Sequence, residues 1–142
     1  MALPRLLLTM GDAAGVGPEV VAASLADASI AESCRLAVIG DANALRRAAA
    51  LMPSRGAPVE EVNESAALFR GESGVIHCFD PTNGLAGGAP VRQISAAAGR
   101  AAYDWLIAAA DLCLSGEADG VVTAPLNKAA LAAAGLNFPG HT

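Results

Sequence analysis

A strand, a turn and the start of a helix follow one another in residues 120–128, GVVTAPLNK. The β-branched residues of this stretch predict a buried strand, and Pro125 ends the strand because proline cannot donate a hydrogen bond to a sheet. Asn127 can cap a helix over residues 128–134, which Gly135 would end in a left-handed conformation. The same order of elements recurs along the chain, so this stretch decides the fold class.

The first third of the chain repeats the pattern twice. The apolar runs 5–10 and 36–39 each predict a strand, and the first is continuous enough to be covered on both faces. A glycine-rich turn follows the first strand, and a helix then starts at Pro18, where a missing amide hydrogen costs nothing. The second strand is followed by a helix that Asn43 can cap and that continues through Leu51. The apolar side of the Pro18 helix is formed by Val20, Val21, Leu25 and Ile30.

The remaining elements complete an alternating order. Residues 75–79 predict a strand, whereas residues 59–65 fit either a short strand or an irregular link. Ser95 can cap the longest helix, which Gly116 ends. Its small and apolar residues repeat at helical spacing: Ala98, Ala102, Trp105, Leu106, Ala109, Leu112 and Cys113. Strands that alternate with helices predict an α/β fold, a mostly parallel sheet with helices on both faces.

Composition narrows the class of protein. The chain has 142 residues, 54% of them hydrophobic, which is enough for the core of one domain. It carries 9 basic against 14 acidic residues and no Lys/Arg cluster, which argues against nucleic-acid binding. Three scattered cysteines indicate a reducing compartment, and no apolar run is long enough for a signal peptide or a membrane span. We therefore expect a soluble, cytoplasmic protein with no membrane partner.

Two charged side chains lie next to predicted strand ends. Asp12 follows the first strand, within the loop Gly11–Glu19, which is either a tight strand-to-helix turn or a loop that lines a ligand site. The loop lacks both the Gly-Lys-Ser/Thr ending of a P-loop and the third glycine of the dinucleotide fingerprint. Lys128 follows the last strand and is either an ordinary solvated lysine or an anion contact. Asp12 and Lys128 are therefore possible site-lining residues.

The two histidines have different surroundings in the sequence. His77 lies in the middle of a predicted strand, which favours a structural role in the core. His141 follows Pro139-Gly140 at the end of a loop, where it is available for proton transfer, a metal or a substrate. No second His or Cys stands at ligand spacing, so the residues do not assemble a complete metal site.

Three motifs together carry a family resemblance. Residues 8–19 (LTMGDAAGVGPE), 122–128 (VTAPLNK) and 138–142 (FPGHT) strongly resemble the 4-hydroxythreonine-4-phosphate dehydrogenase family of pyridoxal phosphate biosynthesis. The Ser95 helix, with Gly99-Arg100-Ala101, also fits this order. Ala13 stands where the family usually has proline. Alanine leaves the turn less rigid than proline would, but the change removes no functional group.

The resemblance implies a fold and a reaction. The fold would be isocitrate/isopropylmalate-dehydrogenase-like, and the protein a homodimer that acts on a phosphorylated small-molecule substrate with NAD and a divalent metal (Zn, Mg or Co). In the family the substrate hydroxyl is oxidised to a ketone, and the resulting β-keto acid loses carbon dioxide to give an aminoketone phosphate. A metal suits this step because it polarises the carbonyl oxygen.

The resemblance also assigns residues. His141 and Thr142 correspond to substrate-binding residues, while the family's metal-ligand histidines and most phosphate-binding residues lie further along the sequence. Catalytic and cofactor-binding residues thus stay unassigned, and no metal ligand is expected in this chain. We expect residues 1–142 to be the N-terminal α/β portion of a longer two-domain dehydrogenase, inactive alone.

Two alternatives remain open at this point. One is a paralogue that acts on threonate or erythronate phosphate, or on a dihydrodiol. The other is a non-catalytic domain that binds an anion or mediates dimerisation.

Overall fold

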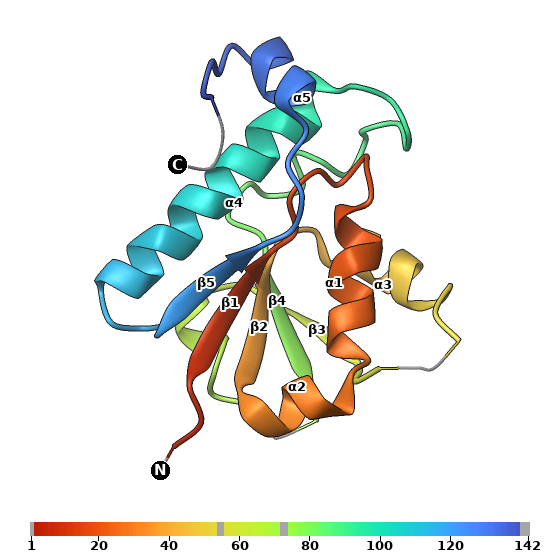
Figure 1. Ribbon diagram of the computed structural model, residues 1–142. Coiled ribbons are helices and arrows are strands. Elements are labelled where there is room, and N and C mark those ends of the chain that lie inside the picture. The colour runs from red at the N-terminus through yellow and green to blue at the C-terminus, as the bar shows by residue number, and fades with distance from the viewer. Residues whose placement is uncertain (1, 54–55, 72–73, 140–142) are drawn as a thin grey trace.

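A five-stranded parallel sheet forms the centre of the computed structural model, which describes residues 2–53, 56–71 and 74–139 (Figure 1). Its order is β3-β4-β2-β1-β5, and all four strand pairs are parallel. The strands are β1 (Arg5–Thr9), β2 (Arg35–Ile39), β3 (Val59–Val62), β4 (Ile76–Phe79) and β5 (Gly120–Thr123). The helices are α1 (Gly17–Leu25), α2 (Ala28–Ser33), α3 (Ala42–Ala49), α4 (Ala96–Leu114) and α5 (Lys128–Ala133), with a 3-10 turn at Ser65–Ala67. The structure confirms the predicted α/β class, and residues 59–62 are a strand.

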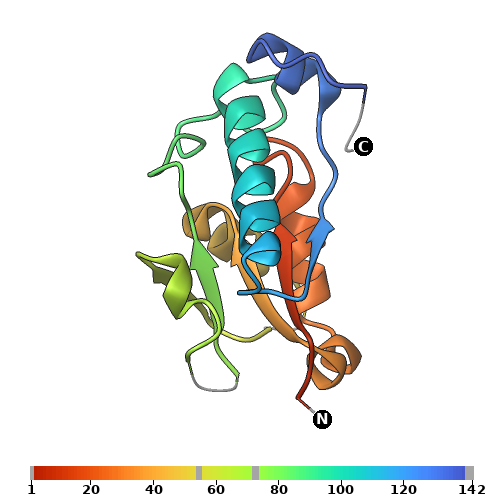
Figure 2. The same cartoon turned by 90° about the vertical axis from the view of Figure 1, so that its left-hand side faces the viewer.

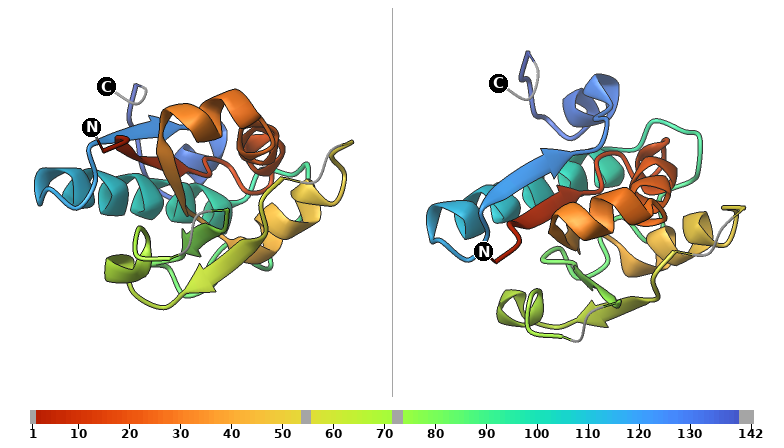
Figure 3. Two further views of the ribbon diagram at one scale, coloured as in Figure 1. Left: turned by 90° about the horizontal axis from the view of Figure 1, so that it is seen from below. Right: turned by 60° about the horizontal axis from the view of Figure 1, so that its bottom comes forward.

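Helices cover both faces of the sheet, as predicted. Figure 2 shows α4 on one face and α1 on the other, and the left view of Figure 3 shows the central strands between these layers. The helix α3 packs beside α1. The connection through α1 and the connection through α4 run across the sheet in opposite directions. Because such crossovers are right-handed, they place their helices on opposite faces.

The core lies between β1, β2 and the inner side of α4. Leu7, Ile39 and Trp105 are fully buried there. As expected, Ser95 caps α4, its hydroxyl accepting a hydrogen bond from the amide of Ala98 at 3.3 Å. Gly116 follows α4 with φ +81°.

Two helix boundaries differ from the sequence-based expectation. The side chain of Asp41, rather than Asn43, caps α3 by accepting hydrogen bonds from the amides of Asn43 and Ala44 at 2.8 and 3.0 Å. The helix predicted to run from Pro18 to Ile30 is split into α1 and α2. Asp27 causes the break, because its carboxylate accepts from the amide of Ser29 and starts a new helix.

The predicted burial of the last strand is wrong for the described part of the chain. Val121 and Val122 of β5 are 37% and 49% exposed, since β5 lies at the end of the sheet and pairs with β1 alone among the described strands. The cap and the end of the following helix are as predicted. Asn127 accepts a hydrogen bond from the amide of Ala130 at 3.0 Å, and Gly135 has φ +80°.

Candidate functional site at the carboxyl ends of β1 and β5

The connections of the sheet change direction between β1 and β5. From β1 the chain crosses through α1 to β2 on one side, and it returns through α4 to β5 on the other side. In open α/β sheets, ligands bind outside the carboxyl ends of the strands at such a switch point. These ends point toward the top of Figure 1, where the loop after β1 and the segment after β5 meet.

The two segments are in direct backbone contact. The amide of Asp12 donates a hydrogen bond to the carbonyl oxygen of Pro125 at 3.1 Å, and the amide of Ala124 donates to Thr9 at 3.0 Å. Gly11 has φ +68°, and a Cβ atom there would lie 2.4 Å from the Pro125 carbonyl oxygen. Only glycine satisfies both conditions, so Gly11 allows the motif after β1 to join the motif after β5.

The carboxylate of Asp12 organises its own loop. Asp12 is 5% exposed, and its Oδ1 accepts a hydrogen bond from the amide of Ala14 at 3.0 Å. The carbonyl of Ala14 in turn accepts a 2.7 Å hydrogen bond from the amide of Arg92, which ties the long loop before α4 to this turn. The loop thus has the features of a tight turn, and it lies at the switch point. Contact of Asp12 with a ligand stays a prediction.

Lys128 lies on the same edge of the sheet but is not joined to Asp12. It is the first residue of α5, immediately after the Asn127 cap, and its side chain is exposed. Within the described residues, no ion pair involves Lys128. Its ammonium group is therefore accessible to an anion at the strand ends.

His141 and Thr142, the predicted substrate-binding residues, lie outside the described residues. The described chain reaches Pro139, two residues before His141. Their predicted role rests on the family resemblance.

Two further aspartates at strand ends were not singled out from the sequence. Asp41 follows β2 and caps α3, and Asp80 follows β4. Asp80 accepts hydrogen bonds from the amide of Thr82 at 2.9 Å, the amide of Gly84 at 3.0 Å and the indole nitrogen of Trp105 at 2.8 Å. An aspartate directly after a buried strand and before a turn or helix was the available signal.

Asp41 and Asp80 both line a cavity of about 460 Å³. The cavity lies at the carboxyl ends of β2, β3 and β4, beside the switch point. Both carboxylates are engaged in holding local backbone, which argues for structural roles. Nearby, burial and the neighbouring carboxylates of Asp80 and Asp41 raise the pKa of the Cys78 thiol to about 12. Cys78 donates to the carbonyl of Gly40 and is a core residue rather than a nucleophile.

The described ranges contain no group of three or more His, Cys, Asp or Glu side chains arranged to hold a metal ion. The described residues therefore do not fit the divalent metal that the resemblance implies, and no chemical role is assigned to a metal. All three cysteines are free. Among the described helices, none is both long and apolar enough to cross a bilayer.

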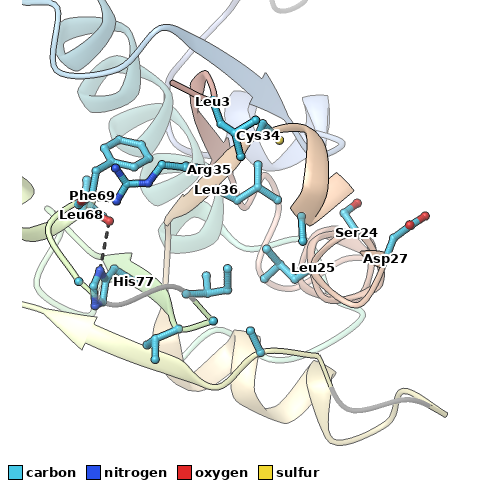
Figure 4. Close-up of a pocket in the computed structure, with 16 residues that line it drawn as sticks. Leu3, Ser24, Leu25, Asp27, Cys34, Arg35, Leu36, Leu68, Phe69 and His77 are labelled. Atoms are coloured by element: carbon cyan, nitrogen blue, oxygen red, sulfur yellow. Dashed lines mark hydrogen bonds between the residues drawn. The ribbon is translucent and has the colours of Figure 1, made fainter. Parts of the chain in front are cut away.

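A second cavity, of about 330 Å³, lies at the opposite edge of the sheet (Figure 4). Its lining includes Arg35 and Leu36 of β2 and His77 of β4. As predicted, His77 is buried, and its Nδ1 lies 3.1 Å from the carbonyl oxygen of Leu68, a bond drawn in Figure 4. This cavity lies at the amino ends of the strands, away from the residues that carry the family resemblance.

Comparison with known proteins identifies the family. Residues 32–142 match the model of the pyridoxal phosphate biosynthetic protein PdxA. The chain belongs to the PdxA family. The D-threonate 4-phosphate dehydrogenase of Cupriavidus necator is 42% identical over 99% of this chain and 41% of its own length. The 4-hydroxythreonine-4-phosphate dehydrogenase of Geobacter metallireducens is 36% identical over 98% of this chain and 40% of its length.

The fold agrees with a solved member of the family. The crystal structure of a 4-hydroxythreonine-4-phosphate dehydrogenase from Burkholderia phymatum superposes with a TM-score of 0.87 at 46% identity, covering 99% of this chain and 42% of that one. The predicted isocitrate/isopropylmalate-dehydrogenase-like fold is thereby confirmed. PdxA relatives are named as dehydrogenases, and this chain spans about two fifths of their length.

Proposed function

We propose that residues 1–142 form the N-terminal part of a longer two-domain, NAD-dependent dehydrogenase of phosphorylated hydroxy acids. The proposal rests on the contact between two of the motifs that carry the family resemblance, residues 8–19 and 122–128. They meet at one edge of the sheet, where Gly11 and Asp12 contact Pro125. A ligand at this switch point would meet the loop after β1, the start of α5 and the segment that leads to His141 and Thr142.

The proposed substrate is 4-hydroxythreonine 4-phosphate. Hydride passes from the carbon that bears the hydroxyl to NAD, and the hydroxyl proton is released, leaving a ketone β to the carboxylate. Loss of carbon dioxide leaves an enolate, which takes up a proton at the carbon that carried the carboxylate to give an aminoketone phosphate. In this chain, His141 and Thr142 would hold the substrate, and Lys128 would contribute positive charge toward a phosphate or carboxylate.

D-threonate 4-phosphate is the second candidate substrate. It is supported by the 42% identity to the Cupriavidus necator relative, which carries that name. The two substrates differ at the carbon next to the carboxylate, where one has an amino group and the other a hydroxyl. The residues that distinguish them must therefore donate to a hydroxyl or accept from an ammonium.

The test is an assay of the longer protein with both substrates. NAD reduction and carbon dioxide release are measured together, with the 142-residue chain assayed in parallel. With one of the two substrates, we expect the longer protein to release one carbon dioxide for each NAD that is reduced. We expect no turnover by the 142-residue chain. An inactive long protein with both substrates would overturn the proposal. Turnover by the short chain would overturn its assignment as an incomplete part. Sedimentation of the long protein tests the proposed homodimer.

A further inference from the structure

Arg92 has a backbone conformation that arginine rarely adopts. Its φ is +65°, and among the described residues Asn83 is the one other non-glycine residue with a positive φ. Asparagine is enriched in this left-handed region because its short polar side chain can bond locally, whereas other side chains cost stability there. Glycine adopts the same conformation without that cost, as Gly84 does in the same loop at φ +84°. The backbone alone therefore favours glycine at position 92, and the arginine calls for a role of its side chain.

A hydrogen bond holds Arg92 next to the switch point of the sheet. Its amide donates to the carbonyl oxygen of Ala14 at 2.7 Å, and Ala14 belongs to the turn that Asp12 organises after β1. Figure 1 shows the loop that precedes α4 running back to the loop that follows β1. The backbone of Arg92 thus lies at the edge of the sheet where the candidate site is.

The guanidinium group of Arg92 makes no structural contact within the described part of the chain. Its side chain is exposed, and none of the ion pairs or cation–π contacts among the described residues involves it. The described arginine side chains that donate hydrogen bonds are those of Arg5, Arg35, Arg46 and Arg100. The guanidinium group of Arg92 is therefore accessible to a ligand at the switch point.

We propose that Arg92 binds the phosphate group of the substrate. A guanidinium group presents a planar set of donors that matches the oxygens of a phosphate. A residue held in a sparsely populated backbone conformation costs stability, and such residues cluster at ligand-binding sites. This inference rests on the proposed function, which supplies a phosphorylated substrate.

The charge of the substrate favours a second cation at this edge. A phosphate monoester carries nearly two negative charges at pH 7. Lys128, at the start of α5, supplies one positive charge. Arg92, on the loop joined to the turn after β1, supplies another. The two cations come from different loops at the carboxyl edge of the sheet and together balance a phosphate dianion.

The first test measures phosphate binding without turnover. Inorganic phosphate should raise the Tm of the longer protein above its value in sodium chloride of equal ionic strength, because a ligand of the folded state stabilises it. In Arg92→Met, which removes the charge, this increase should fall by more than half. Arg47→Met, at an exposed arginine of α3, should keep the full increase. Equal increases in Arg92→Met and the wild type, or no increase in the wild type, would overturn the proposal.

A glycine variant separates the side chain from the backbone. Arg92→Gly removes the cost of the positive φ, so its Tm without phosphate should lie about 1–3 °C above that of the wild type. Its response to phosphate should be as weak as that of Arg92→Met. The matched control is Asn83→Gly, at φ +54° in the same loop, which should respond to phosphate like the wild type. A Tm of Arg92→Gly below that of the wild type would overturn the proposal, because the guanidinium group would then hold the fold.

Kinetics of the longer protein test the contact with the substrate. Arg92→Met should raise the KM for the phosphorylated substrate about tenfold, as expected for loss of a charge-assisted hydrogen bond, and leave the KM for NAD unchanged. Arg92→Lys keeps the charge but not the planar donors, so its substrate KM should lie between those of Arg92→Met and the wild type. Asn83→Gly should match the wild type. An unchanged substrate KM in Arg92→Met would overturn the proposal.

The binding and kinetic tests separate the two possible failures. A wild-type longer protein that is inactive with both substrates would count against the proposed function. The response of its Tm to inorganic phosphate, compared between the wild type and Arg92→Met, would still decide whether Arg92 binds phosphate.

Discussion

The backbone amide of Asp12 and the carbonyl oxygen of Pro125 form a 3.1 Å hydrogen bond between the loop that follows β1 and the segment that follows β5. More than 100 residues separate these motifs in the sequence. Their contact makes them one structural unit at the switch point of the sheet.

Gly11→Ala should destabilise the fold by about 3 kcal/mol or more. The new Cβ would meet the Pro125 carbonyl oxygen at 2.4 Å, and the backbone would hold alanine at φ +68°. Chemical denaturation measures the loss. The matched control is Gly84→Ala, at φ +84° with nothing within 4 Å of the new Cβ, which should cost only about 1 kcal/mol. Equal losses in the two variants would show that the contact with Pro125 is not tight.

Asp80→Ala should lower the free energy of unfolding by about 3 kcal/mol. The change leaves the indole nitrogen of fully buried Trp105 without its 2.8 Å acceptor and removes the acceptor for the amides of Thr82 and Gly84. Thermal or urea unfolding tests this. The control is Asp104→Ala, which breaks the surface ion pair between Arg100 and Asp104 on α4. It should lower the free energy of unfolding by no more than about 0.5 kcal/mol. A loss that small for Asp80→Ala would contradict a structural role for Asp80.

Acid should weaken the contact between Arg5 and Asp119. Hydrogen bonds from Arg5 hold the pKa of the Asp119 carboxyl below its usual value. A lowered folded-state pKa stabilises the fold above the unfolded pKa, at about pH 4, and this contribution is lost as pH falls through the lowered value. The Tm of Asp119→Asn should thus lie below that of the wild type at neutral pH and approach it below pH 4. Asp111→Asn, at an exposed residue of α4, should leave the pH dependence of the Tm unchanged.

Much of the fold could be predicted because its signals are local. The cap at Ser95, the ends at Gly116 and Gly135, and the alternation of strands and helices depend on neighbouring residues. The break at Asp27 and the cap at Asp41 were also local, but apolar spacing across 20–30 and a second candidate cap at Asn43 obscured them. The predicted burial of β5 was wrong because burial depends on which strands lie beside it, and a strand's own residues do not determine that.

The site was predictable in part. The positions of Asp12 and Lys128 after strands placed both at the carboxyl edge. The inward orientation of the Asp12 carboxylate could not be foreseen, because it depends on the turn geometry at Ala14. The Phe138 ring stacks on Tyr103 of α4 with ring centroids 5.7 Å apart. This contact joins residues 35 positions apart and has no sequence signal of its own.

Lys128→Met should weaken substrate binding in the longer protein. Loss of an exposed positive charge at the start of α5 should raise the substrate KM by about three- to tenfold, less so at high salt because the ion contact is screened. Steady-state kinetics at two ionic strengths measures this. Lys128→Arg keeps the charge and should stay near the wild type, and exposed Arg47→Met should have no effect. A Lys128→Met enzyme with unchanged KM would remove Lys128 from the site.

Hydrogen–deuterium exchange of the longer protein, with and without the phosphorylated substrate, tests the location of the site most directly. We predict slower exchange in peptides that cover residues 10–19 and 124–134, and unchanged exchange in peptides around His77 at the opposite edge. Protection confined to the peptides around His77, or no protection at residues 10–19 and 124–134 under saturating substrate, would contradict a site at the carboxyl ends of β1 and β5.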